Sequence, residues 1–133
     1  RDNVARLFAK FGVPATFDLL SIDIDYNDFW VLHAILRRYR PRVVVAEVNR
    51  NLPRGEALTV PYAADTHWTG SAALGFPHGT CYFGMSLRAL DLLAEFHGYK
   101  LIYVCNDGIN GILVDRALLS PAAIAVPFDA IVP

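Results

Sequence analysis

The stretch Phe17–Trp30, FDLLSIDIDYNDFW, decides how this chain can fold. Its first half has the apolar content of a buried β-strand, and its second half carries Asp23, Asp25, Asn27 and Asp28 in quick succession. In open parallel sheets, ligands bind beyond the carboxyl ends of the strands. We therefore predict a strand over residues 17–25 that delivers carboxylates to a crevice. Asn27 or Asp28 would cap the helix that follows.

The residues after this stretch predict a parallel strand pair. Val43–Asn49 has the β-branched composition of a strand buried on both faces. About 17 residues separate the two predicted strands, and that spacing suits a crossover through a helix. A short helix over residues 2–11 precedes the first strand, and Gly12 can end it in the left-handed conformation.

The last third of the chain predicts a helix and a hairpin. Ser86 can cap a helix that Gly98 ends, and strands follow over 99–106 and 111–115. The turn signal Asp107-Gly108 joins these strands as an antiparallel pair. The predicted fold class is therefore α/β, with a sheet of parallel strands, a terminal antiparallel hairpin and helices on the faces.

Residues 1–133 form one predicted domain with a long loop insertion at 50–85. This segment is rich in glycine, proline and aromatic residues, and loops of such length are usually lids or binding loops. The alternative is a surface insertion packed by its own aromatic side chains.

Composition restricts the possible classes of function. Hydrophobic residues make up 54% of the 133 residues and charged residues 19%, which argues against disorder. Twelve Lys and Arg against 13 Asp and Glu give a net charge of −1, so nothing indicates a nucleic-acid partner. No apolar run approaches the roughly 18 residues of a membrane span. Cys81 and Cys105 are too few for a disulfide framework, which mildly favours a reducing intracellular compartment.

Acids and amides follow the ends of the predicted strands. Asp23 and Asp25 are the candidate catalytic residues, and we expect them to project from one strand face because they are two apart. The candidate substrate-binding residues are Glu47, Asn49, His67, Trp68 and Tyr82. Oxygen ligands suit Mg²⁺ or Ca²⁺, with Asp23 and Asp25 as metal ligands, or can hold hydroxyl and amine groups of a ligand. Asn106 and Asp107 can also be read as a turn alone.

Four segments together resemble the C-terminal half of FkbM-like class I S-adenosylmethionine-dependent methyltransferases. They are FDLLSIDIDYNDFWVLHAI, RPRVVVAEVN, FGMSLRALDLLAEFHGYKLIYV and GINGILV, and the likeness covers roughly residues 15–118. The resemblance implies a Rossmann-like sheet and methyl transfer from S-adenosylmethionine to an oxygen or nitrogen acceptor. It places Asp23 and Asp25 at the crevice for cofactor and acceptor.

Two departures from the family pattern matter. Tyr26 stands where the family-like pattern D-x-D-G-N-D has glycine. The Gly-rich turn and the ribose-binding acid of the family's cofactor-binding first half are not present in this chain, so its cofactor-binding residues are unknown. We expect another chain or an upstream segment to complete the sheet. The alternatives are a catalytically silent structural subunit of a larger assembly, or a metal-dependent hydrolase using Asp23, Asp25, Glu47 and Asp107.

Overall fold

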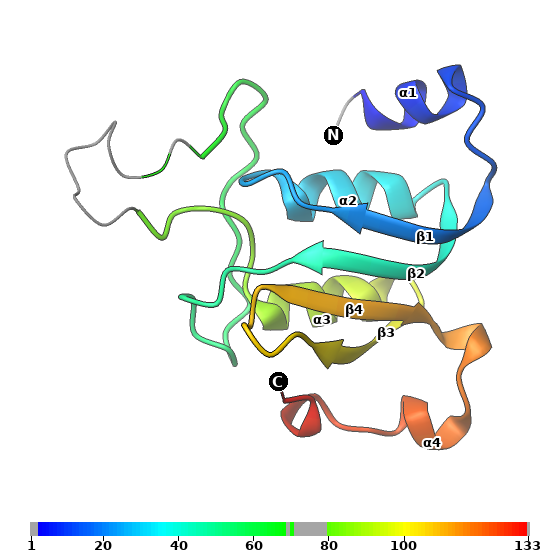
Figure 1. Cartoon of the computed structure of the whole chain (residues 1–133), viewed down its shortest axis with the longest axis vertical. Helices are drawn as coiled ribbons and strands as arrows, with labels where there is room; N and C mark the ends of the chain where they lie inside the picture. Colours follow the sequence, from blue (N-terminus) through cyan, green and yellow to red (C-terminus); the bar gives the residue numbers. More distant parts are fainter. Residues whose placement is uncertain (1–2, 69, 71–79, 133) are drawn as a thin grey trace.

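A four-stranded mixed sheet organises the chain in the computed structural model, which describes residues 3–68, 70 and 80–132 (Figure 1). Its strands, in chain order, are β1 (Thr16–Ile22), β2 (Arg40–Glu47), β3 (Tyr99–Val104) and β4 (Asn110–Asp115). Their order in the sheet is β1-β2-β4-β3; β1 and β2 are parallel, and β4 is antiparallel to both of its neighbours. The predicted parallel pair and closing hairpin are confirmed.

The connections follow from local chemistry. The helix α2 (Asp28–Leu36) makes the crossover from β1 to β2, which places Leu19 beside Val43 and Ile22 beside Ala46. The β3–β4 turn closes with Gly108 in the left-handed region at φ 73°, while its N–H donates to the Cys105 carbonyl. Glycine adopts that conformation without the steric penalty that a Cβ brings.

The core lies between the sheet and two helices on the same face, α2 and α3 (Leu87–Phe96) (Figure 1). The Ser86 hydroxyl accepts the N–H of Ala89 and caps α3, as predicted. Along β4 every second residue is buried, and along α3 the buried leucines recur every third residue. These are the spacings that place side chains on one face of a strand or of a helix. The buried side chains include Leu20, Ile22, Val44, Ala46 and Leu113 from the strands, and Leu87, Leu90, Leu93 and Ala94 from α3.

The opposite face of the sheet carries apolar side chains that the described residues leave partly open. Leu19 is 59% exposed, and Val43, Val45, Ile112 and Val114 are only half-buried. Pairing aligns Leu19, Val43 and Val114 across the sheet, so they share one face. The expectation that β2 is buried on both faces is therefore wrong for the described part of the chain, because α2 and α3 both cover the other face.

Shorter helical segments flank the sheet. The helix α1 (Val4–Lys10) places the Phe8 ring 5.0 Å from that of Tyr39, near the start of β2. The C-terminal segment contains η2 (Arg116–Leu118), α4 (Pro121–Ile124) and η3 (Phe128–Ala130). Across the described ranges, no helix has both the length and the apolar character needed to cross a lipid bilayer.

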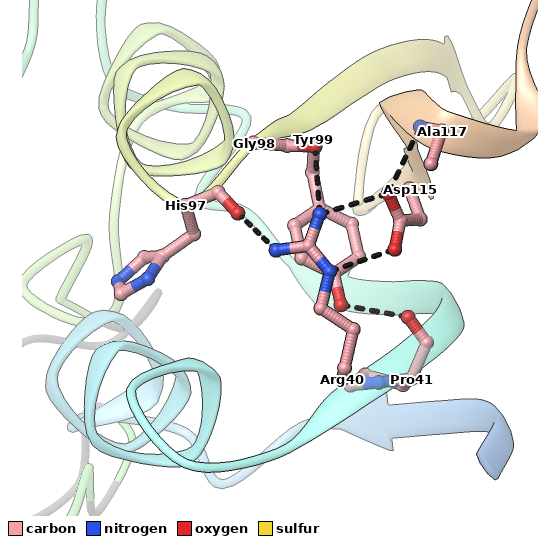
Figure 2. A network of polar contacts seen from close by, with 7 residues as sticks. All are labelled: Arg40, Pro41, His97, Gly98, Tyr99, Asp115 and Ala117. Atoms are coloured by element: carbon pink, nitrogen blue, oxygen red, sulfur yellow. Dashed lines mark hydrogen bonds and ion pairs between the residues drawn. The ribbon is translucent and has the colours of Figure 1, made fainter. Parts of the chain in front are cut away.

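Arg40 joins several elements at the end of the sheet where β2 begins and β4 ends. Its Nε and Nη2 donate to the two oxygens of Asp115 at 2.7 and 2.8 Å (Figure 2). Its Nη1 donates to the carbonyl of His97 at 2.7 Å, and Nη2 also donates to that of Gly98 at 3.3 Å. The start of β2, the end of β4 and the end of α3 are thereby joined through one guanidinium.

The aromatic ring of Tyr99 completes this network. The Arg40 guanidinium lies 4.9 Å from the ring centroid, and the Tyr99 hydroxyl donates to the Pro41 carbonyl at 2.7 Å (Figure 2). Burial raises the pKa of Tyr99 to about 12, so its hydroxyl keeps its proton as a donor across the neutral range.

Asp115→Asn is expected to destabilise the protein by about 1–2 kcal/mol at neutral pH, because it removes a charge-assisted pair to Arg40. The expected loss of stability is modest because the Arg40 side chain is 44% exposed, so solvent screens its ion pair with Asp115. Hydrogen bonds from Arg40 lower the pKa of Asp115 relative to the unfolded chain. The stabilisation is therefore present above the unfolded pKa and is lost as the pH falls through the folded value.

Urea unfolding of wild type and variant between pH 2 and 7 measures this difference. We expect the two curves to begin to converge as the pH falls below about 4, the ordinary range of aspartate, and to meet only below the lowered pKa of folded Asp115. Asp18→Asn, which removes the exposed pair of Asp18 with Arg42, is the matched control and should change stability little. A constant offset between wild type and Asp115→Asn at every pH would contradict the electrostatic account.

Candidate functional site

The backbone turns sharply after β1, and this turn builds the site. β1 ends at Ile22, so the prediction that the strand continues to Asp25 is wrong. Asp25 has a φ of 63°, the left-handed conformation that few residues other than glycine adopt. Asp23 and Asp25 therefore approach each other through the turn of the chain, and not because they alternate along one strand.

Three carboxylates meet at the carboxyl ends of the parallel strands. One oxygen each of Asp23, Asp25 and Glu47 lie within 4.8 Å of one another. Glu47 is the last residue of β2 and is 8% exposed, whereas Asp23 and Asp25 are exposed. The prediction that the ends of β1 and β2 bring acids together is confirmed for these three residues.

A fourth carboxylate, Asp28, lies at the first turn of α2 and is fully buried. Its Oδ1 accepts the N–H of Ile24 at 2.9 Å, which fixes the turn between β1 and α2. The negative charges of Asp23 and Asp25 act on it, and its own charge acts on Glu47. We call Asp23, Asp25, Asp28 and Glu47 the carboxylate cluster.

Burial and mutual repulsion shift the pKa values inside the carboxylate cluster. Burial raises the pKa of Glu47 to about 7, with further increases from Asp23, Asp28 and Asp25, while the N–H of Asp25 lowers it. Burial also raises the pKa of Asp28, against the lowering effect of its hydrogen bond from Ile24. Among the described residues, every side-chain charge that shifts the pKa of these two groups is another carboxylate.

Two oxygens of the carboxylate cluster are buried without a hydrogen-bond partner among the described residues. They are Oδ2 of Asp28 and Oε2 of Glu47. Buried polar atoms in folded proteins are almost always paired, so each exception requires an explanation. Asp91 of α3 also has a buried, unpaired oxygen, and burial raises its pKa. Unlike the carboxylate cluster, however, it has a positive partner, because the guanidinium of Arg88 binds its other oxygen and opposes that rise.

A cavity of about 450 Å³ adjoins the carboxylate cluster at Glu47. Its lining includes Arg50 and the aromatic rings of Trp68 and Phe83. The Trp68 Nε1 donates to the Thr80 carbonyl at 3.0 Å, which holds the indole in the wall. Of the predicted substrate-binding residues, Glu47 and Trp68 share this cavity.

The other predicted substrate-binding residues lie elsewhere. The side-chain amide of Asn49 is buried and uses its hydrogen bonds inside the protein, so we assign it a structural role. Tyr82 is 60% exposed, and its ring centroid lies 6.3 Å from that of the buried Tyr26. His67 is exposed and is not part of the described cavity lining.

The polar residues of the β3–β4 turn stay outside the carboxylate cluster. Asp107 Oδ1 accepts the N–H of Ile109 at 3.0 Å, and Asn106 Oδ1 accepts the Tyr103 hydroxyl. The interpretation of these residues as a turn is confirmed. The hydrolase arrangement that included Asp107 is wrong in this respect, since the group of three carboxylates within 4.8 Å of one another in the described chain consists of Asp23, Asp25 and Glu47.

Asp28 is the site residue whose role the sequence did not disclose. We predicted Asn27 or Asp28 as a helix cap, but the side chain of Asn27 makes no capping bond and pairs with the backbone of Ala63 instead. Asp28 is turned inward, toward Ile24. The available signal was a third acid only three residues after Asp25, next to an apolar strand.

Comparisons of this chain with protein-family models, with curated proteins and with solved structures found no match.

Proposed function

We propose that this chain forms the C-terminal half of a class I methyltransferase-like domain and lines one wall of its acceptor crevice. The observation that supports this most is the sheet order β1-β2-β4-β3, with acids at the carboxyl ends of the parallel β1 and β2. The likeness to that family rests on the same order of strand, helix, strand, helix and closing hairpin along the chain. Ligands in such sheets bind beyond the strand ends, where the carboxylate cluster lies.

The surfaces of the sheet support completion by a further segment. β1 pairs with β2 alone in the described chain, so its outer edge offers free backbone groups to another strand. The apolar face that includes Leu19, Val43 and Val114 is also left open. Strands with two apolar faces are typical of sheets covered on both sides. We infer that an upstream segment or another chain supplies the missing strands and the helices on this face.

The residues of this chain do not fit S-adenosylmethionine without that segment. The turn after β1 presents a buried Tyr26 in the place of the family's glycine, and its ring packs against Tyr82. No Gly-rich turn follows β1. The cofactor would have to be held by the completing segment. The part left to this chain is to orient an acceptor hydroxyl or amine through the carboxylate cluster, since methyl transfer depends mainly on alignment and exclusion of water.

Calorimetric titration with S-adenosylmethionine tests this proposal on two samples, the native material with any associated chains and the 133-residue chain alone. We expect the native material to bind the cofactor and the isolated chain not to bind it. If the native material does not bind the cofactor, the methyltransferase proposal fails. If the isolated chain binds it as tightly as the native material does, the proposed division into two halves fails.

A structural subunit without catalysis is the second candidate, and the position of Tyr26 favours it. A tyrosine that is 6% exposed at the strand end narrows the approach to the crevice. The same titration separates the two candidates when it is combined with mass measurement of the native material. A stable complex that does not bind the cofactor would favour the structural subunit over the methyltransferase.

A further inference from the structure

The carboxylate cluster concentrates negative charge that the described protein does not neutralise. We propose that Asp23, Asp25 and Glu47 bind one hard divalent cation, of the type of Mg²⁺, Mn²⁺ or Ca²⁺. This inference does not depend on the proposed methyltransferase function, because it follows from the geometry of these three side chains and from the burial of Glu47.

The spacing of the oxygens suits a bound cation. Ligands on opposite sides of an ion are separated by twice the metal–oxygen distance, roughly 4.2 Å for Mg²⁺ and 4.6–5.2 Å for Ca²⁺. Oxygens of Asp23, Asp25 and Glu47 all lie within 4.8 Å of one another. One Ca²⁺ ion can therefore contact all three oxygens, whereas Mg²⁺ would require oxygens near the upper limit of this spacing to move closer together.

The unpaired oxygens are the independent evidence for a ligand. Glu47 is 8% exposed and Asp28 is 0% exposed, yet Oε2 of Glu47 and Oδ2 of Asp28 have no hydrogen-bond partner in the described chain. A buried carboxylate is costly unless it is paired or coordinates a metal. Asp91 has Arg88 as its counter-charge, whereas the charges acting on Glu47 and Asp28 are all negative.

The donor atoms select the class of ion. All three side chains offer carboxylate oxygen, which hard cations such as Mg²⁺, Mn²⁺ and Ca²⁺ prefer, whereas zinc sites in proteins usually include histidine or cysteine. Glu47 also lines the cavity that contains Trp68 and Arg50. Coordination positions left free by the protein would therefore be available to water or to an oxygen atom of a ligand in that cavity.

Calorimetric titrations with MgCl₂, MnCl₂ and CaCl₂, supported by electron paramagnetic resonance of bound Mn²⁺, test the site in the full chain. We expect one ion per chain. Asp25→Asn and Glu47→Gln should weaken binding at least about tenfold, because even the loss of an outer-shell partner has that effect. Asp18→Asn is the matched control, since Asp18 lies on β1 and outside the carboxylate cluster, and it should bind like wild type.

Two results of these titrations would overturn the proposal. One is the absence of saturable binding of all three ions up to about 1 mM, the weakest range of protein calcium sites. The other is an equal loss of affinity in Asp18→Asn, which would indicate a diffuse effect of net charge.

Thermal unfolding supplies a second, independent measurement. Removing one charge from a repelling group should raise the Tm of Glu47→Gln above that of wild type in EDTA. A saturating ion should raise the Tm of wild type more than that of the variant, since ligands stabilise only the state that binds them. A lower Tm of Glu47→Gln both with and without metal would mark Glu47 as a purely structural residue and would contradict the proposal.

Discussion

Gly111→Val is expected to destabilise the protein by about 3 kcal/mol or more, because it overfills the interface between the sheet and α3. A Cβ at Gly111 would lie 2.5 Å from Cδ2 of Leu90 and 3.3 Å from Cδ1 of Leu101. Both leucine side chains are fully buried, so neither can swing into solvent to make room. Urea or thermal unfolding measures the effect, and each kcal/mol corresponds to roughly 3–5 °C in Tm at this chain length.

Gly55→Val is the matched control for this prediction. A Cβ at Gly55 meets no atom within 4 Å, and the residue lies in an exposed loop outside the left-handed region. Its effect on stability should stay within about 0.5 kcal/mol, as for most surface substitutions. Equal stability losses for the two variants would show that α3 does not pack against β4 in the way described.

Local sequence patterns were sufficient to predict β1, α2, β2 and the hairpin. A buried strand, a helix start and a β-branched run follow one another within 30 residues, and only a parallel crossover accommodates that order at this spacing. The insertion of β4 between β2 and β3 was not predicted. That choice depends on which strand edge the returning chain meets, which is a property of long-range packing.

Three of the four clustered acids could be predicted because they follow strand ends, where parallel sheets place functional side chains. The fourth could not. An acid at a helix start is ordinarily a cap or a favourable charge near the helix dipole, so Asp28 gave no sign of pointing inward. The inward position of Asp28 depends on the left-handed turn at Asp25. Because we predicted that the strand continues through Asp25, we could not predict this turn.

β2 has apolar side chains on both of its faces, but only one of these faces is covered in the described chain. Val44 and Ala46 are covered by α2 and α3, whereas Val43 and Val45 on the opposite face are half-buried. A strand that faced water on one side would show polar residues at those positions. The residue pattern thus suits a sheet with two covered faces, which supports the inference that another segment packs on this side.

Asn49→Ala is expected to destabilise the protein by about 1–3 kcal/mol, because it removes a buried amide and leaves the partly buried groups hydrogen-bonded to it without a partner. The Asn49 Nδ2 donates to the carbonyls of Cys81 and Phe83 at 2.6 and 3.0 Å. Its Oδ1 accepts the backbone N–H and the side-chain Nδ2 of Asn51 at 3.0 and 3.1 Å. An amide side chain has two donors and one oxygen acceptor, so its hydrogen-bonding groups are all in use.

The structural effect of removing the Asn49 side chain should also be local, since this side chain holds the segment around Cys81 and Phe83 against the end of β2. Urea unfolding gives the free energy, and amide exchange of residues 80–86 should accelerate before global unfolding does. Asn106→Ala, in an exposed turn, is the matched control and should change stability by less than about 0.5 kcal/mol. Asn49→Asp should be no more stable than Asn49→Ala, because it directs a negative oxygen at two carbonyls. If residues 80–86 exchange as slowly in Asn49→Ala as in wild type, other contacts hold the wall of the cavity beside Glu47. The structural role assigned to Asn49 would then be wrong.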